Sequence, residues 1–185
     1  MAGTTELRRG MIIMHNGEPC ILIEKEFYSP GKGAAFNRCK LKSIKTRKIT
    51  SEVIKSGTKV DELDVISKTV SFLYEDGINA YFMDPETFEQ YDILLSEIQG
   101  GKSFLYTEGK YIITLYEGKP IYLQIPAKIT LTVVSTPEGV KGDTVSNATK
   151  EAELETGLVV QVPLFIKNGD KIVVNTEEQT YYSKA

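Results

Sequence analysis

The sequence predicts an all-β protein built from small modules, and three observations support this. Apolar and polar residues alternate with a period of two, as at 129–133, where aliphatic residues alternate with threonines. No long stretch has the 3.6-residue apolar period of an amphipathic helix. Turn-forming pairs recur at short spacing: Asn16-Gly17, Pro30-Gly31, Asp76-Gly77, Glu108-Gly109, Glu117-Gly118, Glu138-Gly139 and Asn168-Gly169. Such spacing indicates small barrels or sandwiches.

The predicted elements follow in order along the chain. Strands are predicted at 21–24, 36–42, 112–116, 121–125 and 129–133, the third and fourth forming a hairpin. In the first of these, Ile21 and Ile23 alternate with Leu22 and Glu24. A single helical turn is expected at 84–89, capped by Asp84.

Charge and turn clusters divide the chain into three modules. The acidic run 61–64 ends the first, and Pro126-Ala127-Lys128 precedes a new alternating strand. The predicted domains are therefore 1–64, 65–127 and 128–185. Because modules of roughly 60 residues bury only a small core each, we expect them to pack on one another.

Composition excludes several classes of protein. Of the 185 residues, 41% are hydrophobic and 25% are charged, as in an ordinary globular protein. No apolar run approaches the roughly 18 residues of a membrane-spanning helix, and the N-terminus lacks the regions of a signal peptide. We therefore expect a cytoplasmic protein with no membrane partner.

Catalytic and metal-binding patterns are also missing from the sequence. Cys20 and Cys39 lie in strand-like runs and are predicted to be buried thiols, and His15, the only histidine, lies beside a turn. These residues do not make a zinc site of the usual kind, so no metal or other cofactor is expected. The run 100–103 resembles the end of a phosphate-binding loop, but position 96 lacks the required glycine and 104–106 is strand-like. We expect no enzymatic activity.

A lysine in a glycine-framed turn is the most informative local feature. Pro30 fixes φ at the second position of a turn, and Gly31 can supply the positive φ of a type II turn. Gly33 frees the backbone beyond Lys32. This pattern predicts a slim hairpin tip that carries Lys32 outward into a narrow cleft. An ordinary solvated hairpin lysine would explain the same turn.

A basic window follows the turn. From residue 29 to residue 55 the chain has eight basic residues and one acid, Glu52, so this window has a net charge of +7 and leaves −10 for the remainder of a chain whose total is −3. A basic region on an acidic body indicates contact with a polyanion.

The strand after the turn places cations in a row. Phe36, Arg38, Lys40 and Lys42 are spaced by two, which puts them on one face about 7 Å apart. Ala35, Asn37, Cys39 and Leu41 take the opposite face, toward the core. The row suits a phosphate backbone, although a solubilising outer face is the alternative.

Several motifs together resemble one family. Pro30-Gly31-Lys32-Gly33, followed by Ala35-Phe36, is similar to the hairpin tip of bacterial elongation factor P. Residues 150–169 match that family's signature at every fixed position: Lys, Ala, Gly, Val-Pro, an aliphatic residue and a closing Gly. Residues 86–90 and 141–144 also match, so the resemblance spans the chain. The related initiation factor five A shares the lysine-tipped hairpin but has two domains, and the third module favours the bacterial factor.

The resemblance implies a fold and a function. The fold would be an N-terminal SH3-like (KOW-type) barrel followed by two OB-fold barrels in an elongated, tRNA-like arrangement. The function would be that of a monomeric translation factor that binds the ribosome between the peptidyl and exit tRNA sites and relieves stalling at consecutive prolines. Its partners would be the ribosome, ribosomal RNA and peptidyl-tRNA, toward whose acceptor end Lys32 would reach.

The resemblance also implies site residues. Lys32 would carry a covalent extension, such as a β-lysyl group, attached by a lysine-modifying enzyme. Gly142, Asp143 and Thr144 would lie near the exit-site codon, although a plain surface turn would use the same residues. Tyr181 and Lys184 would contact tRNA, with lysine replacing the family's arginine and weakening that contact. A generic OB/SH3 nucleic-acid-binding module is the alternative function, and salt-dependent binding to bare oligonucleotides would favour it.

Overall fold

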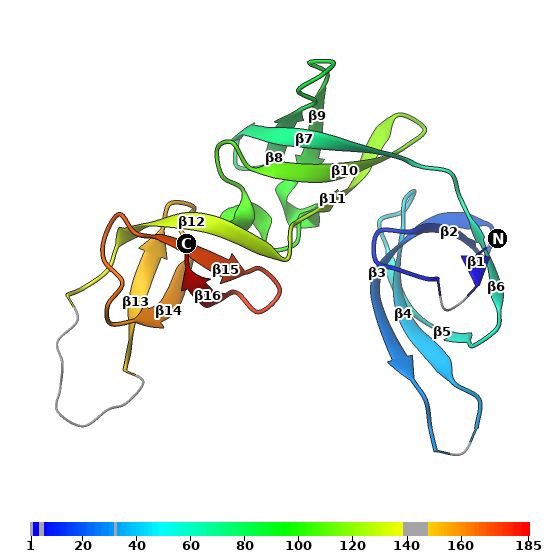
Figure 1. Cartoon of the computed structure of the whole chain (residues 1–185). Helices are drawn as coiled ribbons and strands as arrows, with labels where there is room; N and C mark the ends of the chain where they lie inside the picture. Colours follow the sequence, from blue (N-terminus) through cyan, green and yellow to red (C-terminus); the bar gives the residue numbers. More distant parts are fainter. Residues whose placement is uncertain (1, 4–5, 32, 139–147) are drawn as a thin grey trace. The chain divides into compact units, whose positions relative to one another are not determined.

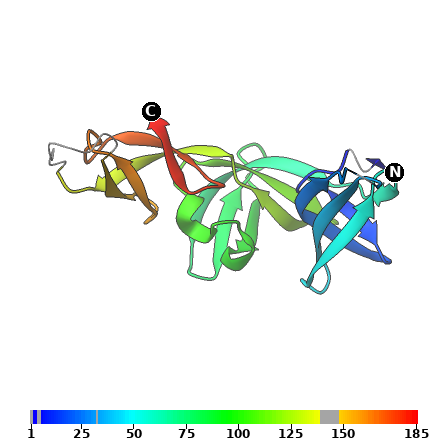
Figure 2. The same cartoon turned by 90° about the horizontal axis from the view of Figure 1, so that it is seen from below.

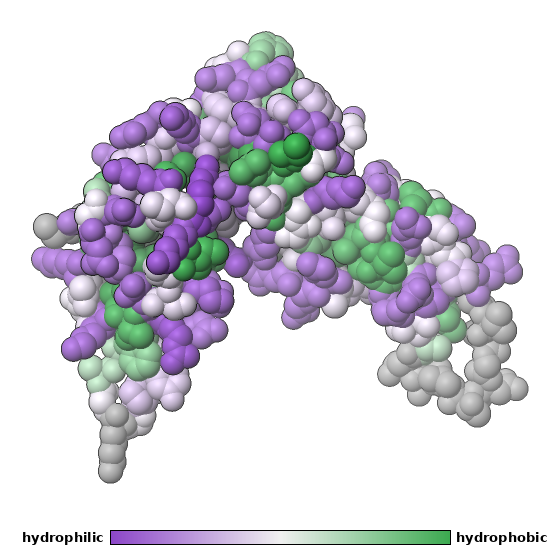
Figure 3. All heavy atoms as spheres, turned by 180° about the vertical axis from the view of Figure 1, so that it is seen from behind, coloured by the Kyte–Doolittle hydropathy of each residue, from purple (hydrophilic) through white to green (hydrophobic). Residues whose placement is uncertain are grey.

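The protein is described by a computed structural model covering residues 2–3, 6–31, 33–138 and 148–185. The described chain consists of β-strands in three sheets, with two short 3-10 helices (Figure 1, Figure 2). The predicted all-β class is confirmed. Some hydrophobic residues stay exposed, and on the face in Figure 3 they form separate patches between hydrophilic ones.

The first sheet has the strand order β1-β6-β2-β3-β4-β5. Its strands are β1 (Ala2–Gly3), β2 (Ile12–His15), β3 (Glu18–Tyr28), β4 (Phe36–Ser43), β5 (Ile49–Lys55) and β6 (Lys59–Glu62). Asn16 and Gly17 connect β2 to β3 with φ values of 51° and 78°, the left-handed pair that a tight type I′ hairpin turn requires.

The strand β3 is buried on both faces of its first half. Leu22 is fully buried in a cluster with both cysteines, whose thiol pKa values are raised by burial. Ile21 packs on the other side, against Ile121. The prediction that Leu22 and Glu24 alternate with Ile21 and Ile23, and so lie on one face, is therefore wrong, because β3 contains a β-bulge between Leu22 and Glu24. The predicted burial of Cys20 and Cys39 is confirmed.

The second sheet has the order β11-β10-β7-β8-β9. Its strands are β7 (Ile66–Glu75), β8 (Asn79–Met83), β9 (Gln90–Leu94), β10 (Lys110–Tyr116) and β11 (Lys119–Gln124), and the 3-10 helices η1 (Leu95–Glu97) and η2 (Gly101–Phe104) follow β9. The prediction of a strand from residue 104 is wrong, because Phe104 ends η2 and enters the core with no exposed surface. The segment 84–89 makes one turn and no helix, closed by the Phe88 N–H donating to the Asp84 carbonyl over 2.8 Å.

The third sheet has the order β14-β13-β12-β15-β16. Its strands are β12 (Lys128–Ser135), β13 (Thr149–Leu154), β14 (Val159–Pro163), β15 (Lys171–Asn175) and β16 (Thr180–Lys184). Alternate residues of these strands form one core, which includes Leu131, Ala152, Val162 and Ile172, all fully buried.

The chain divides into two compact units. The first joins Met1–Lys68 to Ile113–Tyr122, and the second joins Thr69–Ile112 to Leu123–Ala185. The first unit therefore contains the turn between β10 and β11. The predicted boundaries at 64 and 127, and the tRNA-like arrangement, stay predictions.

Candidate functional site

The long hairpin of β3 and β4 carries the predicted tip. Its ladder runs from Glu24 opposite Lys40 to Tyr28 opposite Phe36, without interruption. The rings of Tyr28 and Phe36 lie 5.1 Å apart between centroids and close the end of the ladder. The connecting loop projects past the end of its sheet (Figure 1). The paired strands thus fix the positions at which the loop begins and ends.

The loop itself differs from the predicted turn. Strand pairing stops at Tyr28 and resumes at Phe36, so the chain reverses over a longer loop than a two-residue turn. Gly33 has φ of +123°, whereas Gly31 does not adopt a positive φ. The predicted type II turn with Gly31 at its third position is therefore wrong, because the longer loop places its glycine-requiring conformation at Gly33. Lys32 lies outside the described residues.

The predicted alternation along β4 is confirmed. Asn37, Cys39 and Leu41 are buried, and Arg38 and Lys40 are exposed. Successive side chains of a strand point to opposite faces, and the core therefore takes only one set. Lys42 shares the outer face but is half-buried.

Acidic residues of β3 accompany this row of cations, which the sequence analysis missed. Glu24 lies opposite Lys40 and Glu26 opposite Arg38. The Lys40 Nζ lies 2.6 Å from the Glu24 Oε2, and both side chains are about half exposed. The row is therefore partly neutralised. The sequence analysis missed these acidic residues because it did not foresee the β-bulge between Leu22 and Glu24. This bulge moves both glutamates to the outer face.

The predicted C-terminal residues have unequal surroundings. Tyr181 is half-buried and packs against the core of the third sheet. Lys184 is exposed, and its Nζ lies 2.9 Å from the Asp170 Oδ2. The Lys167 N–H, and then the Lys184 ammonium, hold the pKa of Asp170 below its ordinary value of 3.8. Lys184 is therefore held in an ion pair at the sheet edge.

An exposed aromatic in the same strand was not predicted. Tyr182 occupies an irregularity of the pairing, since Ser183 lies opposite Val173 and Tyr181 opposite Val174. The Lys128 Nζ lies 3.4 Å from the centroid of the Tyr182 ring. A side-chain hydrogen bond with Lys128, and then the lysine charge, lower the pKa of Tyr182. The adjacent tyrosines 181 and 182 were the sequence signal for this exposed ring. Adjacent strand residues point to opposite faces, so only one of the two rings can face the core.

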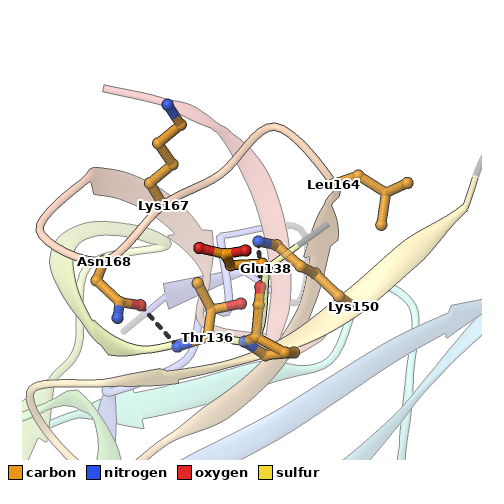
Figure 4. A pocket seen from close by; sticks show the side chains of 7 residues that line it. Thr136, Glu138, Lys150, Leu164, Lys167 and Asn168 are labelled. Carbon is orange, nitrogen blue, oxygen red and sulfur yellow. Dashed lines mark hydrogen bonds between the residues drawn. The ribbon is translucent and has the colours of Figure 1, made fainter. Parts of the chain in front are cut away.

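A cleft of about 470 Å³ opens beside the third sheet, where the signature begins (Figure 4). The Lys150 Nζ donates to the Pro137 carbonyl over 2.6 Å, and the Thr136 N–H donates to the Asn168 Oδ1 over 2.8 Å. Lys150, the first signature residue, thus fastens the end of β12 to the start of β13. Gly142, Asp143 and Thr144 lie outside the described residues.

Family models match the chain along nearly its whole length. Residues 3–60 match the elongation factor P (EF-P) KOW-like domain, residues 65–123 the elongation factor P (EF-P) OB domain, and residues 129–184 the C-terminal domain of elongation factor P.

Related proteins match over their full length. Elongation factor P of Acidothermus cellulolyticus is 40% identical over 185 residues, covering 100% of this chain and 99% of that protein. Elongation factor P of Desulfovibrio desulfuricans is 40% identical over 184 residues, covering 100% of both. The chain belongs to the elongation factor P family.

Membership of the elongation factor P family makes the chain a translation factor and confirms the KOW-type first domain and the OB-type second domain. Among solved structures, eukaryotic translation initiation factor 5A from Methanococcus jannaschii is 21% identical, with a TM-score of 0.39, covering 66% of this chain and 92% of that one. Within the described part of this elongation factor P chain, no helix is long and apolar enough to cross a membrane.

Proposed function

We propose that this chain binds the ribosome between the peptidyl and exit tRNA sites and stimulates peptide-bond formation, relieving stalling at consecutive prolines. The observation that carries the proposal is the 40% identity to elongation factors P over the entire chain. The partners are then the ribosome, ribosomal RNA and peptidyl-tRNA. The chain acts as a cytoplasmic monomer, and light scattering of the purified protein tests the monomeric state.

Lys32 is the functional group of this proposal, with Pro30, Gly31 and Gly33 as its scaffold. The uninterrupted β3–β4 ladder that leads to the loop, closed by Tyr28 and Phe36, supports this assignment. A lysine ammonium on its long stem can donate to phosphate and ribose oxygens at the end of a tRNA.

Positioning is the step that such a tip can supply. Proline is a stiff and poor nucleophile, so the reacting amine and ester seldom meet in the correct geometry. Holding reactants in attack geometry removes an entropic barrier that reaches about 7–11 kcal/mol in well-oriented systems. In this proposal Lys32 orients the acceptor end of the peptidyl-tRNA and transfers no proton. The chain itself is therefore not an enzyme.

A covalent extension on Lys32 would lengthen its reach, and we propose that a lysine-modifying enzyme attaches one. The intact mass of protein from its native cells, followed by peptide sequencing, tests this. Added mass confined to Lys32 is expected. Protein with no added mass, or with the addition on another lysine, would refute the extension.

Arg38, Lys40 and Lys42, together with Gly142–Thr144, Tyr181 and Lys184, are the further RNA contacts of the proposal. The exposure of Arg38, Lys40 and Lys184 supports their inclusion. Half-buried Tyr181 contributes less, because its ring already packs against the core.

The test separates positioning from binding. Lys32→Ala is expected to abolish relief of stalling on a messenger that encodes consecutive prolines, while ribosome affinity stays within about twofold. Lys59→Ala, which removes the same charge from the exposed strand β6, is the matched control and should behave as wild type. Equal loss of relief and of ribosome binding in Lys32→Ala would contradict the positioning role.

A further inference from the structure

The basic window does not form a single patch. Lys40 and Arg38 lie in β4 near the projecting loop, whereas Lys45, Arg47 and Lys48 follow the other end of that strand at Ser43. Arg38 and Lys40 lie five and three residues before Ser43, so at about 3.3 Å per residue they are about 16 Å and about 10 Å from the end of the strand at which the second group begins. One contact with a polyanion at the tip therefore leaves the second group of cations unexplained.

The second group borders a groove of about 590 Å³ within the first unit. Lys45 and Arg47 line it from the β4–β5 loop, and Lys119 lines it from the turn between β10 and β11. Glu117 is the one acid among the residues that line it. The volume lies in the range of small-molecule and nucleotide sites, and the charge favours an anion.

The floor of the groove is apolar and contains one aromatic side chain, that of Tyr116. It consists of Met14, Pro19, Ile44, Tyr116, Pro120 and Ile121. Ile121 is buried, and Tyr116 and Ile44 pack against the cluster that joins the β10–β11 turn to the barrel. Three of the apolar lining residues, Ile44, Tyr116 and Ile121, therefore belong to a packed cluster.

Hydrogen bonds hold the loop that presents the cations. The Arg47 N–H donates to the Ser43 carbonyl over 3.0 Å, and the Ile44 N–H donates to the Pro19 carbonyl over 3.0 Å. The Ser43 hydroxyl donates to the Glu18 carboxylate over 3.0 Å. Because the backbone is fixed at both ends, binding costs little ordering of the loop.

We propose that this groove is a second site for single-stranded RNA, in which Lys45, Arg47 and Lys119 contact phosphates and the apolar floor receives a base. Planar guanidinium and aromatic groups stack on bases and also suit the phosphate charge. The aromatic ring of Tyr116 among the lining residues, on which a base can stack, favours this ligand over an acidic peptide. The site uses neither Lys32 nor the ribosome, so it stands independently of the proposed function.

The test is binding of a fluorescently labelled ten-nucleotide RNA to the full chain, measured by anisotropy at several salt concentrations. Each phosphate contact with a single strand contributes a slope of about −0.7 to log K against log salt. Lys45→Ala/Lys119→Ala is therefore expected to make the slope less negative by about 1.4 and to lower the affinity at 0.1 M salt by about 25-fold. Lys59→Ala/Lys171→Ala removes equal charge elsewhere and should lose less than about threefold.

Further measurements keep the proposal falsifiable. The Lys32→Ala chain should retain the groove-dependent binding, and RNA containing 4-thiouridine should cross-link to the peptide that contains Tyr116. Unchanged affinity in the groove variant, or cross-links confined to the hairpin loop, would overturn the proposal. Binding of an acidic peptide of equal charge, without binding of RNA, would assign the groove to a protein partner instead.

Discussion

The ion pair between Lys40 and Glu24 restrains the cation that the proposed function assigns to RNA. If Lys40 contacts a phosphate on the ribosome, it must first leave the Glu24 carboxylate, 2.6 Å away. Glu24→Gln keeps the shape of that side chain and removes its charge. We therefore expect this variant to bind ribosomes more tightly than the wild type.

The magnitude follows from the exposure of the pair. Both side chains are about half exposed, with 49% of Lys40 and 41% of Glu24 accessible. Exposed ion pairs contribute about 0.2–1 kcal/mol. Because 1.4 kcal/mol is a factor of ten in affinity, releasing Lys40 is expected to strengthen ribosome binding by about 1.5-fold to fivefold.

The assay is a titration of ribosomes with labelled factor at low and high salt. Glu62→Gln, which removes one exposed acid from β6, is the matched control for a general change in net charge. The gain of Glu24→Gln should exceed that of Glu62→Gln and should vanish when Lys40→Ala is added. Equal gains in the two variants, or a gain that persists without Lys40, would refute the reasoning.

Three further predictions concern stability and protonation. Tyr111 is buried and its hydroxyl donates to the Phe104 carbonyl over 2.7 Å, so Tyr111→Phe should lower the free energy of unfolding in urea by about 1–3 kcal/mol, and a change below about 0.5 kcal/mol would argue against that bond. Gly100 has φ of +75° and an added Cβ would overlap the Phe104 ring, so Gly100→Ala should lower the thermal midpoint, and an unchanged midpoint would show that η2 can move. Because the pKa of Asp170 is lowered by folding, its carboxylate stabilises the folded state at pH values above its ordinary pKa of 3.8. This stabilisation is lost as the pH falls through the lower pKa that Asp170 has in the folded protein. Carboxyl NMR should therefore place this midpoint below 3.8 and show it rising in Lys184→Met, whereas no rise would mean that the backbone N–H alone sets it.

Local patterns predicted much of the fold, because they depend on neighbouring residues. The two-residue period of β4 correctly assigned Asn37, Cys39 and Leu41 to the core. Where a strand has apolar contacts on both faces, as at Ile21 and Leu22, the period does not identify the exposed face. The same limit applies to Phe104, whose apolar side chain suits a strand and the end of a 3-10 helix equally well.

The sequence showed the row of cations in β4 but not the acidic residues that lie opposite them. The cations of β4 are adjacent in sequence and visible as a row, whereas Glu24 and Glu26 reach them only through strand pairing. The bulge after Leu22 decides this, because without it Leu22 and Glu24 would share the inner face. A one-residue change in register therefore determines whether Lys40 has a partner.

The sequence by itself determined the all-β class, the elongation factor P family and the lysine-bearing loop, since each is written in local spacing and in matched motifs. Only the tertiary structure paired Lys40 with Glu24 and brought Lys119 to the groove beside Lys45 and Arg47. Those relations join segments far apart in the chain. Their geometry follows from register, bulges and packing, which no local pattern of residues specifies.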